Sequence, residues 1–156
     1  MDVFKLTDKN IFVTGASSGI GREIAISASK YGAKVIITGR NEERLNNTYS
    51  ELSGEGHLAL PADLTDEKQI AFLVDKLPKL HGVVFSAGLT AHMPAKFIRQ
   101  ANIDHLFNIN FESPVLATGR LLKKRKILDS GSIVFLSSIG SKYSYFGGAM
   151  YSSSKA

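Results

Sequence analysis

Short apolar runs alternate with amphipathic stretches along the chain. The runs lie at residues 11–13, 35–37, 58–60, 83–85 and 133–136. Their apolar residues are consecutive and do not alternate with polar ones, as is typical of strands that are covered on both faces. The pattern therefore predicts five buried β-strands.

The stretches between these runs carry apolar residues at the spacing of a helix. Three apolar stripes are predicted to face the core: Ile20, Ile24, Ala28 and Tyr31; Leu45, Tyr49 and Leu52; and Ile70, Leu73, Val74 and Leu77. A long fourth helix is predicted over about residues 101–126, and a further helix is predicted to begin at Tyr151.

Strict alternation of strands and helices indicates right-handed βαβ units and a parallel sheet. We therefore predict a single α/β domain over residues 1–156, with a doubly wound parallel sheet of the Rossmann type. The fifth strand would form an unprotected apolar edge, which natural sheets avoid. The sequence also stops where the helix at Tyr151 begins. We expect further strands and helices to follow in a longer protein, and the 156 residues alone to be inactive.

Composition narrows the class of protein. The chain has no cysteine, and no apolar run approaches the roughly 20 residues of a membrane-spanning helix. The N-terminus lacks the apolar segment of a secretory signal. We therefore expect a cytoplasmic protein that does not enter a membrane.

The chain is basic, with a net charge of +5. Its densest cationic cluster, Lys123, Lys124, Arg125 and Lys126, closes the predicted fourth helix. These cations either complement the negative pole of that helix or contact an acidic partner. Because no aromatic residues are interleaved with them, we expect no nucleic-acid binding. The four histidines are scattered and predict no metal site.

A glycine-rich turn, "TGASSGIGREIA", follows the first predicted strand and opens a helix. Gly15, Gly19 and Gly21 permit a tight turn and a close approach of the backbone to a pyrophosphate, which the positive helix N-terminus favours. The alternative is a turn that is only structural. A dinucleotide cofactor is therefore predicted here.

The end of the second strand indicates which dinucleotide binds. An NAD site usually carries an acidic residue here for the ribose 2′-hydroxyl, but this chain has Gly39 followed by Arg40. An arginine can hold the 2′-phosphate of NADP with charge-assisted hydrogen bonds. Unless Arg40 is a plain surface charge, the cofactor is NADP(H).

With these motifs the chain resembles the classical short-chain dehydrogenase/reductase family over all 156 residues. "ADL" at 62–64 is similar to the family's adenine-binding segment, and "SAG" at 86–88 to its N-A-G motif. The resemblance implies a set of cofactor-binding residues: Gly15, Ser17, Ser18, Gly19, Ile20, Gly21, Arg40, Asp63, Leu64, Ser86, Ala87, Gly88, Tyr151 and Lys155. Ser86 replaces the usual asparagine, which braces the central strand, so we expect a modest loss of rigidity there.

The resemblance also implies a catalytic tetrad of Asn110, Ser138, Tyr151 and Lys155. A ketone accepts hydride readily only if its oxygen receives a proton, which Tyr151 would give. Residues four apart share a helix face, so Lys155 would favour the Tyr151 phenolate, strongly only where water is excluded. Ser138 would hold the substrate oxygen; its neighbour Ser137 is the weaker candidate because it points to the opposite side of the strand.

Asn110 would lie inside a helix, four residues before Pro114. Because proline has no N–H, the Asn110 carbonyl lacks its α-helical donor. We hypothesise that this carbonyl holds a water that leads to Lys155; the alternative is a simple helix kink.

The predicted function is NADP(H)-dependent interconversion of a ketone and a secondary alcohol. The overall resemblance favours reductases of 3-oxoacyl groups on acyl carrier protein, whereas sugar, steroid and small-ketone reductases share every motif. A non-catalytic NADP-binding regulatory protein is the rival from another class. By resemblance we expect a homodimer or homotetramer that acts on a small-molecule or carrier-bound carbonyl substrate.

Overall fold

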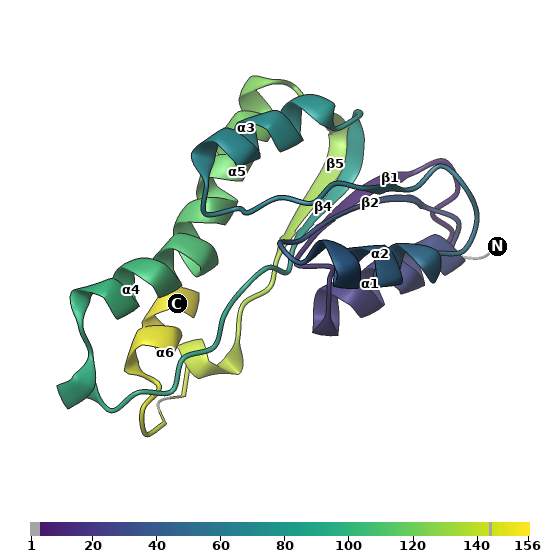
Figure 1. The fold of residues 1–156 in the computed structure, drawn as a ribbon. Helices are drawn as coiled ribbons and strands as arrows, with labels where there is room; N and C mark the ends of the chain where they lie inside the picture. The colour runs from purple at the N-terminus through teal and green to yellow at the C-terminus, as the bar shows by residue number, and fades with distance from the viewer. Residues whose placement is uncertain (1–3, 144) are drawn as a thin grey trace.

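The computed structural model describes residues 4–143 and 145–156. Its centre is one parallel five-stranded sheet with the strand order β3-β2-β1-β4-β5 (Figure 1). The strands are β1 (Asn10–Thr14), β2 (Lys34–Thr38), β3 (Leu58–Ala59), β4 (Leu80–Phe85) and β5 (Ile127–Phe135). The predicted doubly wound α/β fold is confirmed, because each strand is joined to the next by a helical crossover.

The helices occupy the predicted intervals between the strands. They are α1 (Gly19–Lys30), α2 (Glu42–Ser50), α3 (Glu67–Lys76), α4 (Gln100–Phe107), α5 (Ser113–Lys123) and α6 (Ala149–Lys155). A π-helical segment, η2 (Asn108–Glu112), joins α4 to α5, and two short 3-10 turns are η1 (Ala95–Phe97) and η3 (Ile139–Ser141).

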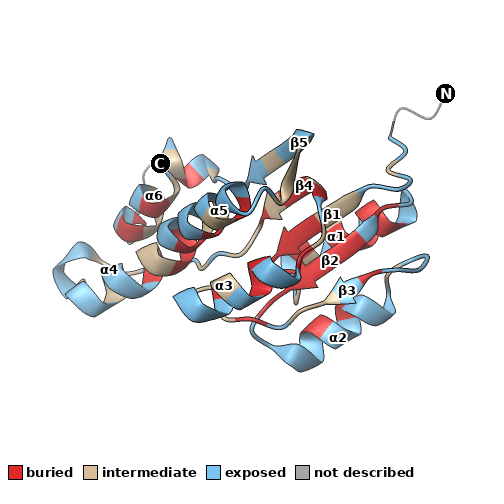
Figure 2. Cartoon of the chain, turned by 90° about the horizontal axis from the view of Figure 1, so that it is seen from above, coloured by how far each residue is buried: buried red, intermediate tan, exposed pale blue. Residues whose placement is uncertain are grey.

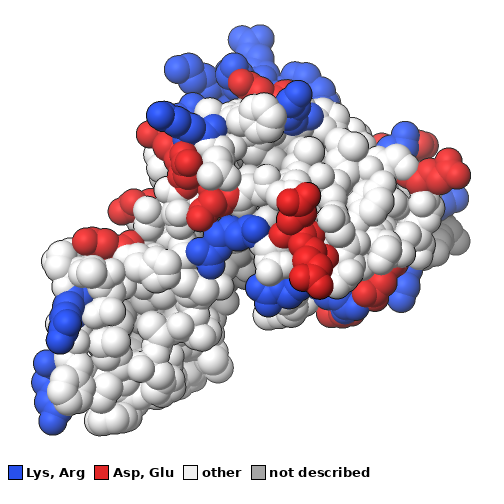
Figure 3. Space-filling view, viewed as in Figure 1, with Lys and Arg blue, Asp and Glu red and all other residues white. Residues whose placement is uncertain are grey.

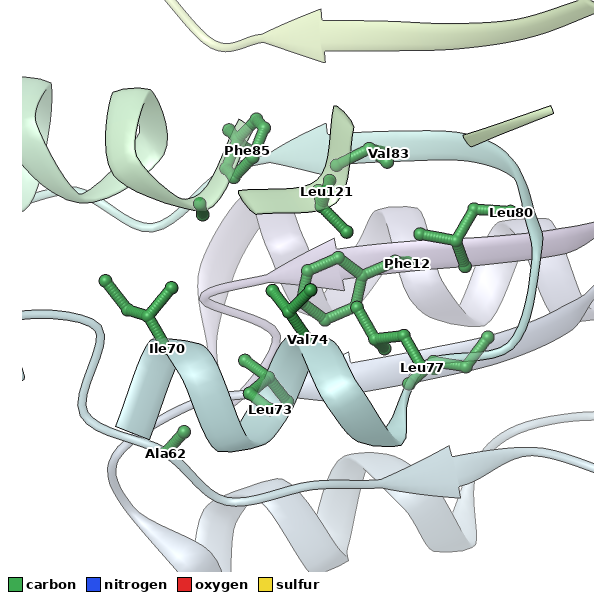
Figure 4. Packing of buried hydrophobic residues seen from close by; sticks show 12 residues of the cluster. Phe12, Ala62, Ile70, Leu73, Val74, Leu77, Leu80, Val83, Phe85 and Leu121 are labelled. Carbon is green, nitrogen blue, oxygen red and sulfur yellow. The ribbon is translucent and has the colours of Figure 1, made fainter. Parts of the chain in front are cut away.

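The sheet is covered on both faces, which explains the continuous apolar runs. Alternate side chains of β1 point to opposite sides: Phe12 packs with α3 and α5, whereas Val13 packs with α1 and α2. In Figure 2 the central strands β1, β2 and β4 are coloured mainly as buried, whereas the edge strand β5 is exposed or intermediate. The α3 stripe of Ile70, Leu73, Val74 and Leu77 is buried against Phe12, as predicted (Figure 4).

The predicted stripe on α1 is correct for Ala28, which is buried, and for Ile24, which packs partly buried against the core, but it is wrong for the other two residues. Ile20 is 66% exposed and Tyr31 is 48% exposed. The helix instead buries a face of mainly small residues, which include Gly21, Ala25 and Ala28, because it lies close to the sheet. The α2 prediction holds for Leu45, which is fully buried, but not for the exposed Tyr49.

The predicted fourth helix is not a regular α-helix. The backbone N–H of Ser113 donates to the carbonyl of Asn108, five residues earlier, within the π-helical segment. Pro114 cannot donate to the Asn110 carbonyl, and a π-helical turn is one way to accommodate that missing bond. The helix then ends at Lys123 and not at residue 126, because β5 begins at Ile127.

The basic cluster forms the end of α5, at the amino ends of β4 and β5. Lys126 donates through its backbone N–H to the Leu121 carbonyl and Arg125 to that of Leu122, which is a Schellman motif. The Lys126 ammonium donates to the Asp75 and Leu77 carbonyls at the end of α3. Cations at helix C-termini are favourable, so this part of the cluster has a structural role.

The rest of the cluster is also partly neutralised. The Lys124 ammonium lies 3.0 Å from a carboxylate oxygen of Asp75, and its hydrogen bond lowers the pKa of that carboxyl below the ordinary value. In Figure 3, Lys and Arg side chains gather over the end of the molecule where α3 and α5 lie, with acidic groups among them.

Strand β5 lies at one edge of the sheet, as predicted. Its Val134 and Phe135 side chains are half-exposed, and the Phe135 ring stacks on Phe85 of β4 with 5.0 Å between the ring centroids. None of the helices that the structure describes combines the length and the apolar composition that crossing a bilayer requires.

Arg125 offers a test of the helix end. It has a φ of 51°, in the left-handed region that favours glycine. We expect Arg125→Gly to raise the free energy of unfolding by about 1 kcal/mol, because the left-handed conformation is unfavourable for residues with a Cβ. Chemical denaturation measures the change. Lys123→Gly, inside the last helical turn, is the control, and it should lower the free energy of unfolding by about 1 kcal/mol. If Arg125→Gly also lowered the free energy of unfolding, the left-handed conformation assigned to Arg125 would be wrong.

Candidate active site

The turn after β1 approaches the segment after β4 so closely that glycine is required. Gly15 has a φ of 67°, and a Cβ added to it would lie 2.6 Å from the Cα of Ala87. A Cβ on Gly21 would lie 2.6 Å from the Gly15 carbonyl oxygen. No real Cβ tolerates such distances, so these positions admit only glycine.

The hydroxyl of Thr14 joins the same two segments. Its Oγ1 atom accepts hydrogen bonds from the backbone N–H groups of Ser86 and Ala87, both at 3.1 Å. Thr14 is fully buried at the end of β1. The Ser86 hydroxyl lies against Gly21, 3.0 Å from the position of a Cβ there. Thr14 therefore braces the backbone beside Ser86, where the usual asparagine is absent.

The N-terminus of α1 is prepared for an anion. Its N-cap, Ser18, makes no side-chain hydrogen bond to the helix in the described structure, and the first turn has no acidic residue. By contrast, α2 and α3 are capped by the side chains of Asn41 and Asp66 and have acidic first turns. Uncapped N–H groups at a helix start favour phosphate.

A cleft of about 390 Å³ opens over this turn, at the carboxyl ends of the strands. It is lined by residues of the segments 15–21, 39–44, 62–65 and 86–89, and by Ile109. Twelve of the predicted cofactor residues line it: Gly15, Ser17, Ser18, Gly19, Ile20, Gly21, Arg40, Asp63, Leu64, Ser86, Ala87 and Gly88. Tyr151 and Lys155 do not line it.

The charges of the cleft suit a phosphorylated nucleotide. Arg40 and Arg44 both line it, as does Gly39, and Asp63 supplies a carboxylate to the lining. Arg22 also follows the glycine turn, but its guanidinium is bound to both carboxylate oxygens of Glu51 at 2.6 Å. This hydrogen bond raises the pKa of Arg22 above the ordinary value.

Asp63 is held in place by a residue that the sequence did not single out. One oxygen of its carboxylate accepts from the Thr65 backbone N–H at 2.9 Å and from the Thr65 hydroxyl at 2.8 Å. Its backbone N–H donates to the Gln69 side chain. The D-x-T spacing, an aspartate two residues before a hydroxyl, is a signal that could have predicted this turn.

Ser138 and Tyr151 meet at Gly140. A Cβ on Gly140 would lie 3.3 Å from the Ser138 hydroxyl oxygen and 3.5 Å from the Tyr151 ring. Ser138 follows β5 and its oxygen accepts from the Gly140 N–H at 3.1 Å. Tyr151 lies in the first turn of α6, which begins at Ala149 and not at Tyr151 as predicted.

Lys155 and Asn110 meet at Gly88, beside the cofactor cleft. A Cβ on Gly88 would lie 3.3 Å from the Lys155 ammonium and 3.2 Å from the side-chain oxygen of Asn110. Lys155 follows Tyr151 by about one helical turn, so the two residues share a face of α6. Its ammonium donates to the Leu136 carbonyl at 3.0 Å.

Asn110 ties three segments together. Its side chain accepts from the Leu89 N–H at 2.8 Å and donates to the Leu89 carbonyl and to the Ser154 hydroxyl, both at 2.9 Å. Asn110 is buried, within the π-helical segment. The hypothesis that its backbone carbonyl holds a water stays a prediction.

Ser113 links the same segment to the cofactor cleft, which sequence reasoning missed. Its buried hydroxyl contacts the carbonyls of Leu64 and Asn108. Ser137, the weaker catalytic candidate, donates its hydroxyl to the Lys155 carbonyl at 2.9 Å and so binds the end of α6.

A pair of rings borders the Tyr151 side of the site. The His92 and Tyr145 rings have centroids 5.0 Å apart, and a Cβ on Gly140 would lie 3.4 Å from the Tyr145 ring. The Met93 N–H donates to the Gly147 carbonyl and joins the two loops that carry these rings.

Comparisons with known proteins match this geometry. The family described as short chain dehydrogenase matches residues 9–156. The chain is 37% identical over 142 residues to L-xylulose reductase of Caenorhabditis elegans, covering 86% of this chain and 55% of that protein. It is 33% identical over 151 residues to the 3-oxoacyl-[acyl-carrier-protein] reductase FabG of Rickettsia felis, covering 97% of this chain and 62% of that protein. The chain thus spans between half and two thirds of the length of these relatives.

Solved structures are similar over nearly the whole chain. A putative short chain dehydrogenase from Escherichia coli CFT073 complexed with NADPH has a TM-score of 0.88 and 32% identity, covering 97% of this chain and 68% of that one. The oxidoreductase yciK from E. coli has a TM-score of 0.87 and 33% identity, with coverages of 97% and 66%.

The Asn110 contacts predict a large structural effect. We expect Asn110→Ala to lower the free energy of unfolding by about 2 kcal/mol, because the Leu89 N–H and carbonyl lose their partner. Urea denaturation of the complete protein measures the change. Asn47→Ala, at an exposed position of α2, is the control and should change it by less than about 0.5 kcal/mol. Similar values for the two variants would mean that Asn110 does not hold these segments.

Proposed function

Because this chain belongs to the short-chain dehydrogenase family, we propose that its protein is an NADP(H)-dependent oxidoreductase that interconverts a ketone and a secondary alcohol. One observation carries the proposal. The Ser138 hydroxyl and the Tyr151 ring converge at Gly140, while Lys155 of the same helix reaches Gly88 in the lining of the cofactor cleft.

The residues of the cleft fit NADP(H). The uncapped start of α1 suits the pyrophosphate, and the glycines leave room for its close approach. Arg40 and Arg44 supply positive charge beside Gly39, where an NAD site would carry an acidic residue. The structural relative from E. coli CFT073 was solved with NADPH, which supports the same choice here.

The catalytic residues provide proton transfer. The bound nicotinamide supplies the hydride, or accepts it in the reverse direction. Tyr151 donates a proton to the carbonyl oxygen as negative charge develops on it, and Ser138 donates a hydrogen bond to the same oxygen. The Lys155 ammonium favours the phenolate that Tyr151 becomes, more strongly as water is excluded from the site.

The substrate is a 3-oxoacyl group or a small hydroxylated ketone. The FabG relative supports the first, and the L-xylulose reductase relative supports the second. The position of the basic cluster gives little support to the idea that an acidic acyl carrier docks there. The cluster lies at the amino ends of β4 and β5, whereas Ser138 follows the carboxyl end of β5, and Lys124 and Lys126 already bind Asp75 and the end of α3.

The proposal is tested with the complete protein, NADPH and two ketones, a 3-oxoacyl thioester and L-xylulose. We expect Tyr151→Phe to lower kcat at least about 100-fold, because the proton donor is lost, while NADPH still binds. NADPH absorbance follows turnover, and NADPH fluorescence follows binding. Tyr143→Phe removes an exposed hydroxyl in the preceding loop and should leave kcat unchanged.

The rival class has a distinct outcome. Binding of NADPH without turnover of any ketone would favour a non-catalytic NADP-binding regulatory protein. A Tyr151→Phe variant that keeps the rate of the unsubstituted enzyme would refute the assigned proton donor.

A further inference from the structure

Gly39 lies at the end of β2, where an acidic residue would define an NAD site. We infer that Ser17 keeps this position glycine by occupying the space of its side chain. The preference for NADP(H) is then set by excluded volume at Gly39 as well as by the charge of Arg40. This inference rests on the proposed function for its cofactor, but its steric part can be tested without one.

The obstacle at Gly39 is spatial. Its φ lies outside the left-handed region, so the backbone itself accepts a residue with a side chain. A Cβ on Gly39 would lie 3.1 Å from the Ser17 hydroxyl oxygen, 3.2 Å from the Ser17 Cβ and 3.5 Å from the Ser17 nitrogen. The first two distances are tighter than nine in ten real Cβ contacts, so Ser17 would have to move by a few tenths of an ångström, whereas the third is an ordinary van der Waals distance. The added group would point at Ser17 and not into open space.

Backbone movement at Ser17 is restrained, because its neighbour Ala16 is held from two sides. The Ala16 N–H donates to the Thr38 carbonyl at 3.1 Å. The Ala16 carbonyl accepts from the hydroxyl of Thr48, a fully buried residue of α2, at 2.9 Å. Ala16 is itself fully buried, so its peptide groups have little freedom to shift.

Gly39 is held in the same way. It is buried, and its carbonyl accepts from the Ala62 N–H at 3.3 Å. The preceding residue, Thr38, is bonded through its hydroxyl to the Leu60 carbonyl at 2.6 Å. Hydrogen bonds therefore restrain the backbone on both sides of this contact, so the Ser17 Cβ has little room to move away from Gly39.

The inference predicts that residues 17 and 39 determine the cofactor together. Gly39→Asp alone places a carboxylate against Ser17, where it is misdirected and repels the 2′-phosphate. Ser17→Gly combined with Gly39→Asp gives the carboxylate room to accept from a ribose 2′-hydroxyl. Ser17→Ala is intermediate, because it keeps the Cβ at 3.2 Å.

The steric part is tested by thermal unfolding of the complete protein without nucleotide. We expect Gly39→Ala to lower Tm by about 2–4 °C when Ser17 is present. In the Ser17→Gly background the same substitution should leave Tm unchanged or raise it, because alanine restricts the unfolded chain. Ser18→Gly is the matched control, because Ser18 is the exposed neighbour of Ser17 and makes no capping hydrogen bond. In the Ser18→Gly protein, Gly39→Ala should lower Tm as much as it does in the unsubstituted protein.

The cofactor part is tested by fluorescence titration with NADPH and NADH. We expect Gly39→Asp to weaken NADPH binding at least about 10-fold without a matching gain for NADH. Adding Ser17→Gly should then strengthen NADH binding about 10-fold over Gly39→Asp alone.

Each outcome decides a separate point. The inference is overturned if Gly39→Ala lowers Tm equally with Ser17 present and in the Ser17→Gly background. It is also overturned if proteins that carry Gly39→Ala are unfolded in both backgrounds. NADH affinity of Gly39→Asp equal to that of the double variant also overturns it. Failure of the unsubstituted protein to bind either nucleotide refutes the proposed function instead, while the Tm comparison still decides whether Ser17 excludes a side chain at 39.

Discussion

The site depends on the close approach of two backbone segments, the turn after β1 and the segment after β4. Gly15 and Ala87 come together at a distance that no Cβ permits, and the Thr14 hydroxyl bonds both segments. Because the segment after β4 continues into Gly88 and Leu89, the same approach places the cleft beside Asn110 and Lys155, two of the proposed catalytic residues. The glycines and the buried threonine thus shape the cleft through the backbone.

Helix α6, which carries the proposed catalytic residues Tyr151 and Lys155, is held by polar contacts near its C-terminal end. Asn110 reaches α6 through Ser154, and Ser137 binds the carbonyl of Lys155. Each contact comes from a different part of the fold, the π-helical segment and the segment after β5. This arrangement places the Lys155 ammonium beside Gly88, where it donates to the Leu136 carbonyl.

Much of the fold follows from local patterns, but contacts between distant residues do not. The α3 stripe was predicted correctly because its large apolar residues are also its buried ones, whereas Ile20 of α1 is exposed because small residues form the buried face there. The twelve cleft residues were predicted because a glycine turn and strand ends meet at one edge of any parallel sheet. The roles of Ser113 and Thr65 depend on side-chain hydrogen bonds that no periodicity reports.

The π-helical turn at Asn108–Glu112 constrains how this segment can change. Such a turn contains one residue more than an α-helical turn, and each residue advances the helix by about 100°. Deletion of a single residue would rotate either Asn110 away from Leu89 or the buried Ala117 and Leu121 of α5 away from the core, and Pro114 would still leave one carbonyl without its helical donor. The rotation of α5 relative to α4 is therefore set by the number of residues between them. Sequences with this architecture should vary in this segment by substitution and not by changes in length.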